Sequence, residues 1–303
     1  MPSDPTAPDW YSHGLNRVVY YRLASAAAAA LPRPVRLQLA RGLGRLLARA
    51  LPAERRAVRR NFGRVLAGAP APFIEARVTE TFASFGTFFA DLLTLNRRRG
   101  VDLRAHVTST DGEHHLDTAL ASGRGVVLLT AHLGNWELAG RLLSSRGGGR
   151  TAHIVLSAEQ DAALERYLRF DGPQLRFVTR HRATSTLGLL AALRRGELVA
   201  MQADRPSGGR GDALVPFFGE PAAFPLGPFV LARATGAAVV SAFCTMAPGG
   251  RYRLEIDPPI WVKPGEEQAG LATVVAVLER VIRAHPTQWF NFFDAWSPPR
   301  GHP

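Results

Sequence analysis

Apolar residues recur along this chain with two different spacings, which divide its 303 residues into two parts. Over roughly the first hundred residues, the spacing is that of helices with one apolar face. Beyond them, short apolar runs of the length of buried strands alternate with helical segments of about 10 to 15 residues. Such alternation indicates a mainly parallel sheet covered on both faces. The predicted fold class is therefore α/β, with a central sheet flanked by helices and an N-terminal helical extension.

Three regions follow from this pattern. Residues 1–9 are polar and contain prolines, and we expect a disordered tail there. Residues 10–100 are expected to form a helical region that packs on the core, and residues 101–303 to form the α/β core. Helices are predicted at residues 11–31, 35–51, 52–66, 72–95, 111–121, 159–169, 184–195, 227–234 and 267–284, and from Asn135 onward. Strands are predicted near Val107 and at residues 125–130, 151–156, 176–178, 198–202, 238–246 and 252–256, the last of them antiparallel after a Pro-Gly-Gly turn.

Two of the predicted helices carry patterns that allow two interpretations each. In residues 35–51, leucines recur at helical spacing, and Arg41, Arg45 and Arg49 form an i, i+4 row on another face. A basic amphipathic helix of this kind either lies in the headgroup layer of a membrane or packs its leucines on the core. Residues 72–95 carry phenylalanines at helical spacing. These side chains either belong to the core or line a groove for an alkyl chain.

The amino-acid composition limits which class of protein this chain can be and which kinds of partner it can bind. With 46% apolar residues the chain is globular, and no run reaches the ~18 to 20 apolar residues of a membrane span. The net charge of +12 comes from arginine, since Lys263 is the only lysine, a bias that a GC-rich genome favours whatever the function. A basic surface attracts anionic lipid headgroups and acidic proteins, but no nucleic-acid-binding signature is present, so no nucleic acid partner is expected. The single cysteine, Cys244, excludes a disulfide within the chain, which fits a cytoplasmic compartment.

The candidate chemistry lies in residues 130–137, Thr-Ala-His-Leu-Gly-Asn-Trp-Glu. This stretch follows a predicted buried strand and precedes a helix, so it places His132 at the carboxyl edge of the sheet, where ligands of open α/β sheets bind. Glu137 follows about one and a half helical turns later, from where its carboxylate can fold back onto the imidazole. A histidine backed by a carboxylate is a general base for a hydroxyl proton, and that hydroxyl can belong to the substrate. Asn135 is a good N-cap, and Trp136 is expected to pack beneath the site.

This stretch resembles the H-x-x-x-x-E motif of the bacterial lipid A late acyltransferase family, within the lysophospholipid acyltransferase superfamily. Four further stretches are similar to the family in order and spacing: residues 198–206, a strand ending in an acidic residue; 215–228, an "FFG-x-P-A … P-x-G" block; 231–240, a helix and strand; and 286–296, a closing "P-x-Q-W" segment. The resemblance covers roughly residues 55–297. It implies a glycerolphosphate acyltransferase-like fold. It also implies transfer of a fatty acyl group from an acyl carrier protein or coenzyme A thioester to a hydroxyl of a lipid or glycolipid, with a His132/Glu137 dyad as base and no metal or cofactor.

The resemblance implies further site residues. Asp204 is expected in the active site, and Arg205 is the candidate for holding a phosphate or stabilising the oxyanion. The alternative is an Asp-Arg pair that only shapes the glycine-rich loop after it. Gly227 is expected to open a helix whose N-terminal amides face an anion. The expected catalytic residues are His132, Glu137, Asp204 and Arg205, and the expected substrate-binding residues are Asn135, Trp136, Phe217, Phe218, Gly219 and Gly227. With no signal peptide or span evident, attachment to the cytoplasmic face of the inner membrane is expected to be peripheral.

The chain departs from the family pattern in two places. The family's Tyr-Arg pair is missing from residues 153–160, and the closing segment lacks a basic W-x-H-x-R ending. Arg180 and Arg182 are candidates to supply the missing arginine. Both departures concern the acceptor, so an amino lipid, a phosphatidylinositol mannoside or an aryl polyene lipid is an alternative to lipid A. A hydrolase and a non-catalytic membrane or carrier-protein binding module are the alternative classes. His114-His115 lacks a third ligand at zinc spacing.

Overall fold

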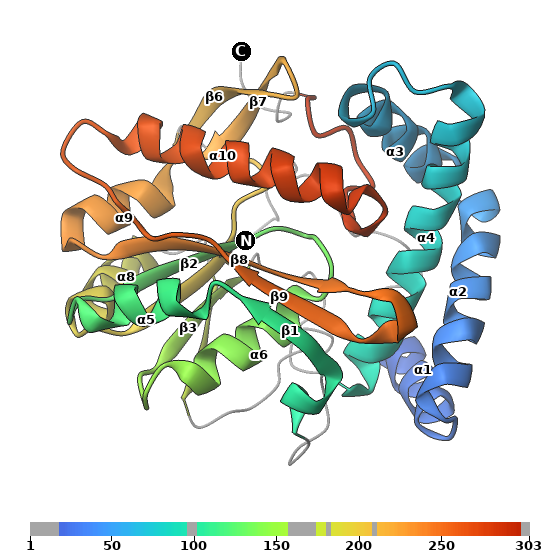
Figure 1. Cartoon of the computed structure of the whole chain (residues 1–303), viewed down its shortest axis with the longest axis horizontal. Helices are drawn as coiled ribbons and strands as arrows, with labels where there is room; N and C mark the ends of the chain where they lie inside the picture. The colour runs from blue at the N-terminus through green and yellow to red at the C-terminus, as the bar shows by residue number, and fades with distance from the viewer. Residues whose placement is uncertain (1–17, 96–101, 157–173, 180–182, 208–210, 298–303) are drawn as a thin grey trace, which may run out of the picture.

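The computed structural model describes residues 18–95, 102–156, 174–179, 183–207 and 211–297. The tail at residues 1–9, the helix predicted at 159–169 and the arginines Arg180 and Arg182 lie outside these residues. Within the described part, the centre of the molecule is an eight-stranded sheet (Figure 1). Its strands follow one another in the order β1 (Val107–Asp111), β9 (Tyr252–Ile256), β8 (Ala238–Met246), β2 (Val126–Thr130), β5 (Leu198–Gln202), β3 (Ala152–Leu156) and β4 (Leu175–Thr179), with β10 (Ile260–Trp261) beside β8.

Most neighbouring strands of this sheet are parallel. β2 pairs in parallel with β5 on one side and with β8 on the other, and β3 pairs in parallel with β5 and β4. β9 runs antiparallel to β8, as the Pro-Gly-Gly turn predicts, and parallel to β1. The predicted fold class, a mainly parallel sheet flanked by helices, is therefore confirmed.

Helices cover both faces of the sheet. α5 (Glu113–Ala121) and α6 (Trp136–Arg146) lie on one face, and α9 (Gly227–Thr235) and α10 (Glu267–Ala284) on the other (Figure 1). Successive residues of β2 alternate between the two cores: Val126 and Leu128 pack with the helices of the first face, and Val127 and Leu129 with those of the second. Burial on both faces explains why this strand is a continuous apolar run. α8 (Ala183–Arg194) also contributes to the second core.

The N-terminal helices stand beside the sheet as a stack. They are α1 (Val18–Ala29), α2 (Arg33–Ala50), α3 (Pro52–Val65) and α4 (Ala71–Leu93). Two glycines let α2 and α4 approach closely. A Cβ on Gly44 would lie 2.2 Å from the carbonyl oxygen of Phe82, and a Cβ on Gly86 would lie 2.2 Å from that of Ala40. Among the described residues, no helix is both long and apolar enough to cross a membrane.

A two-stranded hairpin beyond the main sheet was not predicted. β6 (Asp212–Phe217) and β7 (Glu220–Pro225) pair antiparallel, with Phe218 and Gly219 as the turn. Both turn residues have positive φ, 50° and 85°, as a tight two-residue hairpin turn requires. Prolines within the block argue against strands, because proline cannot donate to a sheet. Pro216 stands opposite Pro221 in a ribbon of only two strands. Each of these strands has a free edge, where a proline is tolerated, so the argument does not apply.

Candidate active site

The register of two neighbouring strands brings the first two site residues together. β2 and β5 pair in parallel with Thr130 opposite Gln202, and the ladder continues as the amide of Ala203 donates to the carbonyl of Thr130 at 2.9 Å. His132 and Asp204 each lie two residues beyond this last pair. Because both strands end at the same edge of the sheet, their side chains meet there.

Asp204 is the carboxylate that contacts the imidazole of His132. Nδ1 of His132 lies 2.8 Å from Oδ1 of Asp204, and the same oxygen accepts the backbone amide of His132 at 3.1 Å. Oδ2 accepts the indole N–H of Trp289 at 3.0 Å. With Nδ1–H donating to this fixed carboxylate, the neutral ring carries its lone pair on Nε2. This is the tautomer that a general base needs.

The charges around the pair favour a neutral imidazole and an ionised carboxylate. Burial lowers the pKa of His132, and the nearby Arg205 cation lowers it further, while Asp204 acts in the opposite direction. For Asp204, burial alone would raise the pKa, but the His132 ring, Arg205 and the Trp289 indole together lower it to about 2. At neutral pH the site therefore holds a free base next to a carboxylate.

The turn after His132 depends on a glycine. Gly134 has φ 61°, and a Cβ there would lie 2.1 Å from the carbonyl oxygen of Cys244 in β8. The turn is also tied to its surroundings by backbone bonds. Phe290 donates to the carbonyl of His132 at 2.7 Å, and the amide of Asn135 donates to the Cys244 carbonyl at 2.7 Å. The close approach leaves no room for a side chain at position 134.

Asn135 links the turn to the helical stack. Its Oδ1 accepts the amide of Leu138 at 3.1 Å, which confirms the predicted N-cap of α6. Its Nδ2 donates to the hydroxyl of Tyr252 at 3.1 Å, and that hydroxyl donates to the fully buried Asp91 of α4 at 2.6 Å. Arg33, at the start of α2, forms an ion pair with Asp91 at 2.5 Å. The buried Asn135 side chain thus serves to hold the turn.

Glu137 lies in the first turn of α6 and is half-buried. Its charge acts on Arg141, one helical turn later, where it opposes the lowering of the Arg141 pKa by burial. Nδ1 of His132 is held by Asp204 instead of Glu137. The pairing of His132 with Glu137 therefore stays a prediction.

Arg205 reaches across to the closing segment, residues 286–296. Its Nε donates to Oδ1 of Asn291 at 2.9 Å and its Nη2 to the carbonyl of Phe290 at 3.0 Å. The guanidinium carbon also lies 5.0 Å from the ring centre of Phe293. Arg205 lies close enough to His132 and Asp204 for its charge to act on both, and these contacts tie it to the closing segment. Its role as an active-site cation stays a prediction.

Aromatic side chains surround the imidazole on the side of α4. The ring of Trp136 lies 5.3 Å from that of His132, edge to face, and 4.3 Å from that of Phe88. Phe85, Phe88 and Phe290 pack together with Trp136 in one cluster. The phenylalanines predicted on residues 72–95 therefore form an apolar wall next to the site.

The other residues predicted to bind substrate are Phe217, Phe218, Gly219 and Gly227. Phe217 is buried, and its ring stands 5.9 Å from Trp289, which in turn contacts Asp204. Phe218 and Gly219 form the hairpin turn, where the amide of Phe218 donates to Glu279 of α10 at 2.5 Å. Gly227 begins α9, as predicted. Phe217 therefore packs on Trp289, the residue that donates to Asp204.

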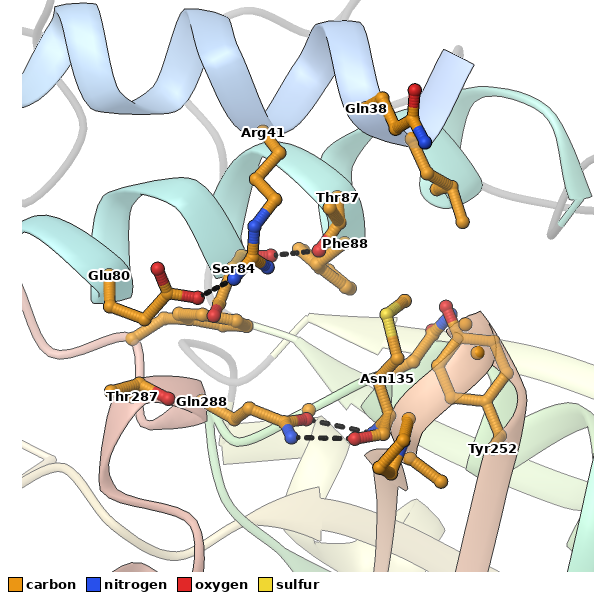
Figure 2. Close-up of a pocket in the computed structure, with 18 of the residues that line it drawn as sticks. Gln38, Arg41, Glu80, Ser84, Thr87, Phe88, Asn135, Tyr252, Thr287 and Gln288 are labelled. Atoms are coloured by element: carbon orange, nitrogen blue, oxygen red, sulfur yellow. Dashed lines mark hydrogen bonds and ion pairs between the residues drawn. The ribbon is translucent and has the colours of Figure 1, made fainter. Parts of the chain in front are cut away.

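A cleft of about 510 Å³ borders the turn that carries His132, and Figure 2 shows residues that line it. α2 and α4 form one side of it, and the connection between β8 and β9 forms the other. Gly134, Asn135 and Phe290 belong to its lining, so it borders the turn that carries His132. Arg41 and Glu80 form an ion pair at its rim, and the side-chain amide of Gln288 is bonded to the backbone of Met246.

Sequence reasoning assigned no role to Trp289, Phe290 or Asn291. These residues contact Asp204, His132 and Arg205 respectively, from about 85 residues or more along the chain. These residues lie in the closing "P-x-Q-W" segment. Its resemblance to the family pointed to the segment but gave no role to any residue in it.

A buried histidine thus lies against a carboxylate at the carboxyl edge of a parallel sheet, which is an arrangement that suits a general base. Comparison with known proteins identifies its family: residues 17–297 match the model of the bacterial lipid A biosynthesis acyltransferases, and the chain belongs to this family. The protein is therefore an acyltransferase, and the predicted family is confirmed.

The chain is similar to two groups of named acyltransferases. It is 28% identical to the phosphatidylinositol mannoside acyltransferase of Mycobacterium tuberculosis (strain ATCC 25618 / H37Rv), over 79% of this chain and 76% of that one. It is also 28% identical to the lipid A biosynthesis lauroyltransferase of Escherichia coli (strain K12), over 86% and 84% of the two chains. Among solved structures it matches the 1-acyl-sn-glycerophosphate acyltransferase PlsC of Thermotoga maritima with 14% identity and a TM-score of 0.39, over 85% of this chain and 99% of that one.

Proposed function

We propose that this acyltransferase moves a fatty acyl group from the thioester of an acyl carrier protein or coenzyme A to a hydroxyl of a lipid or glycolipid acceptor. The observation that carries the proposal is the 2.8 Å contact between Nδ1 of His132 and Oδ1 of Asp204. It leaves Nε2 as the basic atom of a neutral ring, ready to accept a hydroxyl proton.

In the proposed reaction, Nε2 of His132 takes the proton of the acceptor hydroxyl as its oxygen attacks the thioester carbonyl. The tetrahedral intermediate then collapses, the carbon–sulfur bond breaks, and the imidazolium returns the proton to the departing thiolate. Asp204 stabilises the imidazolium between the two steps. Arg205 is the proposed partner of the oxyanion or of a phosphate on the substrate, because its cation lies beside the pair.

Two carboxylates are candidates for the partner of His132. Asp204 contacts Nδ1, whereas Glu137 is the acidic residue of the H-x-x-x-x-E motif. We propose Asp204 as the residue that orients the ring and retain Glu137 as the alternative from the motif. Separate substitutions of the two distinguish these roles.

For the acceptor, we propose a glycolipid of the phosphatidylinositol mannoside type. Similarity to phosphatidylinositol mannoside acyltransferases supports this choice, as does the departure of the closing segment from the basic ending of lipid A enzymes. A lipid A precursor is the second candidate, supported by the equal identity to the lauroyltransferase. Both acceptors offer hydroxyls to the same base.

We propose peripheral attachment to an anionic membrane surface through the outer face of α2. Val35, Leu39, Leu43 and Leu46 form this face and are 44%, 59%, 58% and 58% exposed. Leu47, by contrast, packs against the core. A row of exposed leucines on an arginine-rich helix is what an interfacial helix requires. The arginine row is partly neutralised, because Arg41 and Arg45 pair with Glu80 of α4.

The test is acyl transfer by the purified protein, with acyl carrier protein and coenzyme A thioesters as donors and a phosphatidylinositol mannoside or a lipid A precursor as acceptor. We expect an acylated acceptor from the wild type and none above background from His132→Ala. His114→Ala, at an exposed histidine of α5, is the matched control and is expected to retain activity. Near-normal transfer by folded His132→Ala would refute the proposal.

The same assay separates the alternative classes. A hydrolase releases free fatty acid at the full rate with no acceptor present, whereas a transferase needs the acceptor. A non-catalytic binding module gives no turnover with any donor, and its binding to vesicles or carrier protein survives loss of both His132 and Glu137.

A further inference from the structure

Tyr252 connects the His132 turn, residues 132–135, to the N-terminal helices through its hydroxyl. The side chain comes from β9 and is fully buried. Its hydroxyl accepts the Nδ2–H of Asn135 at 3.1 Å and donates to Oδ2 of Asp91 in α4 at 2.6 Å. Burial and the charge of Asp91 raise the pKa of Tyr252 above its ordinary value, so the hydroxyl keeps its proton and both bonds at neutral pH.

The acceptor of this hydroxyl, Asp91, is itself held in a fixed orientation. Nε and Nη2 of Arg33, at the start of α2, donate to its two carboxylate oxygens at 3.0 and 2.5 Å. Nη2 also donates to the carbonyl of Gly250 at 2.6 Å, and Nη2 of Arg36 lies 3.9 Å from Oδ1 of Asp91. Two parallel bonds from one guanidinium fix the plane of the carboxylate. They therefore fix the direction from which Oδ2 receives the hydroxyl of Tyr252.

Stability alone does not explain a charged pair at this place. Asp91 is fully buried. Taking a carboxylate and a guanidinium out of water costs about as much as their attraction returns, and apolar residues of similar volume often stabilise a fold as well or better. What such bonds supply is direction, because each of them has a preferred angle. Here that direction is passed through Tyr252 to a residue three positions after His132.

Asn135 passes this support on to the base. Its backbone amide is bonded to β8, its Oδ1 to α6 and its Nδ2 to Tyr252. The 2.8 Å contact between His132 and Asp204 lies at the other end of the same short turn. A displacement of the turn by about 1 Å would lengthen that contact beyond hydrogen-bond reach, and a misplacement of this size can cost about 100-fold in rate.

We propose that Tyr252 is a positioning residue for acyl transfer: its hydroxyl holds the His132 turn so that Nε2 of His132 keeps its direction toward the acceptor hydroxyl. Asp91 and Arg33 act through this hydroxyl. The helices α2 and α4 are thereby part of the architecture of the active site. The inference rests on the proposed role of His132 as base.

The test is Tyr252→Phe, which removes the hydroxyl and keeps the ring. We expect kcat to fall by about tenfold or more and KM for donor and acceptor to stay within about twofold, because the base is misplaced while the substrates still bind. A second readout needs no substrate. It is the exchange with solvent of the Nδ1–H proton of His132, followed by NMR of histidine-labelled protein and assigned by its loss in folded His132→Ala. Exchange is expected to be about tenfold faster or more in Tyr252→Phe, since the contact with Asp204 opens more often.

Thr108→Val is the matched control. Oγ1 of Thr108 donates to the backbone carbonyl of Tyr252 at 3.0 Å, so this variant weakens β9 at the same residue and leaves the hydroxyl in place. It is expected to lower Tm without changing kcat or the exchange of the Nδ1–H proton of His132.

Arg33→Lys tests the far end of the network. It keeps the positive charge but loses the two parallel bonds to Asp91, and kcat is expected to fall by about threefold. The double variant Arg33→Lys/Tyr252→Phe is expected to lose no more activity than Tyr252→Phe alone, because Arg33 acts through the hydroxyl. Two independent losses of stability would instead add.

The outcomes are distinguishable. If the wild type transfers no acyl group, the proposed function fails, and the exchange of the Nδ1–H proton decides the positioning role by itself. If the wild type is active and folded Tyr252→Phe matches it in kcat and in proton exchange, the positioning role is overturned and the proposed function stands. Equal losses of kcat in Thr108→Val and Tyr252→Phe also overturn it, because the stability of β9 then accounts for the effect. Should Tyr252→Phe fail to fold, unchanged kcat and exchange in Arg33→Lys overturn the role.

Discussion

His132 and Asp204 are 72 residues apart in the sequence, yet Nδ1 of one lies 2.8 Å from Oδ1 of the other. The parallel pairing of β2 with β5 produces this contact, since both residues follow the same register pair by two positions. The contact between the imidazole and the carboxylate is thus produced by two adjacent strand ends. Four predictions follow from it and from its surroundings.

Asp204→Asn is expected to lower kcat by about 10²- to 10⁴-fold, because the amide can no longer fix the Nδ1–H tautomer or stabilise the imidazolium. Glu137→Gln is the matched comparison, and its effect is expected to be smaller, since Asp204 is the carboxylate at Nδ1. Steady-state kinetics of the two folded variants provide the measurement. A larger loss of kcat in Glu137→Gln than in Asp204→Asn would show that Glu137 is the partner of His132.

The rate of the wild-type enzyme is expected to depend on pH through a midpoint below 6.5, the ordinary pKa of histidine, because burial and Arg205 lower the pKa of His132. The basic form of the ring is the active one, so kcat/KM rises with pH through this midpoint and is level at neutral pH. Asp204, with a pKa of about 2, stays ionised across this range. A pH profile of kcat/KM checks the prediction, and a midpoint above 6.5 contradicts it.

Gly134→Ala is expected to lower the free energy of unfolding by about 2 kcal/mol or more and to abolish activity, since a Cβ would lie 2.1 Å from the carbonyl oxygen of Cys244 at a positive φ. Gly63→Ala is the control. It lies in α3 with no atom within 4 Å of an added Cβ, and is expected to be neutral or to stabilise by about 0.5 to 1 kcal/mol. Urea unfolding of the two variants measures both effects.

Leu39→Glu/Leu43→Glu is expected to weaken binding to anionic vesicles by about tenfold or more, because each leucine loses its apolar burial in the membrane. The measurement is co-sedimentation with phosphatidylglycerol-containing vesicles. Leu187→Glu, at a leucine of α8 that is 69% exposed, controls for a general loss of apolar surface. Equal binding by the double variant and the wild type would exclude α2 as the docking face.

Much of the fold could be predicted from local patterns. Continuous apolar runs such as Val126–Thr130 mark strands buried on both faces, and helical spacing marks α2 and α4. The N-cap role of Asn135 also followed from its position before a helix. The hairpin of β6 and β7 was not predicted because its prolines argue against strands. In a two-stranded ribbon each strand has a free edge, where a proline is tolerated.

By itself, the sequence determined the family, the strand–turn–helix unit that carries His132, and the presence of Asp204 and Arg205 at a second strand end. Only the tertiary structure decided which carboxylate meets the imidazole and which residues hold Arg205. The physical reason is that the spacing of apolar residues shows which side chains are buried. The partners of a buried polar group depend instead on the order of the strands in the sheet and on which distant segment packs over the site. β5 lies next to β2, and the closing segment brings Trp289 and Asn291 back across the site.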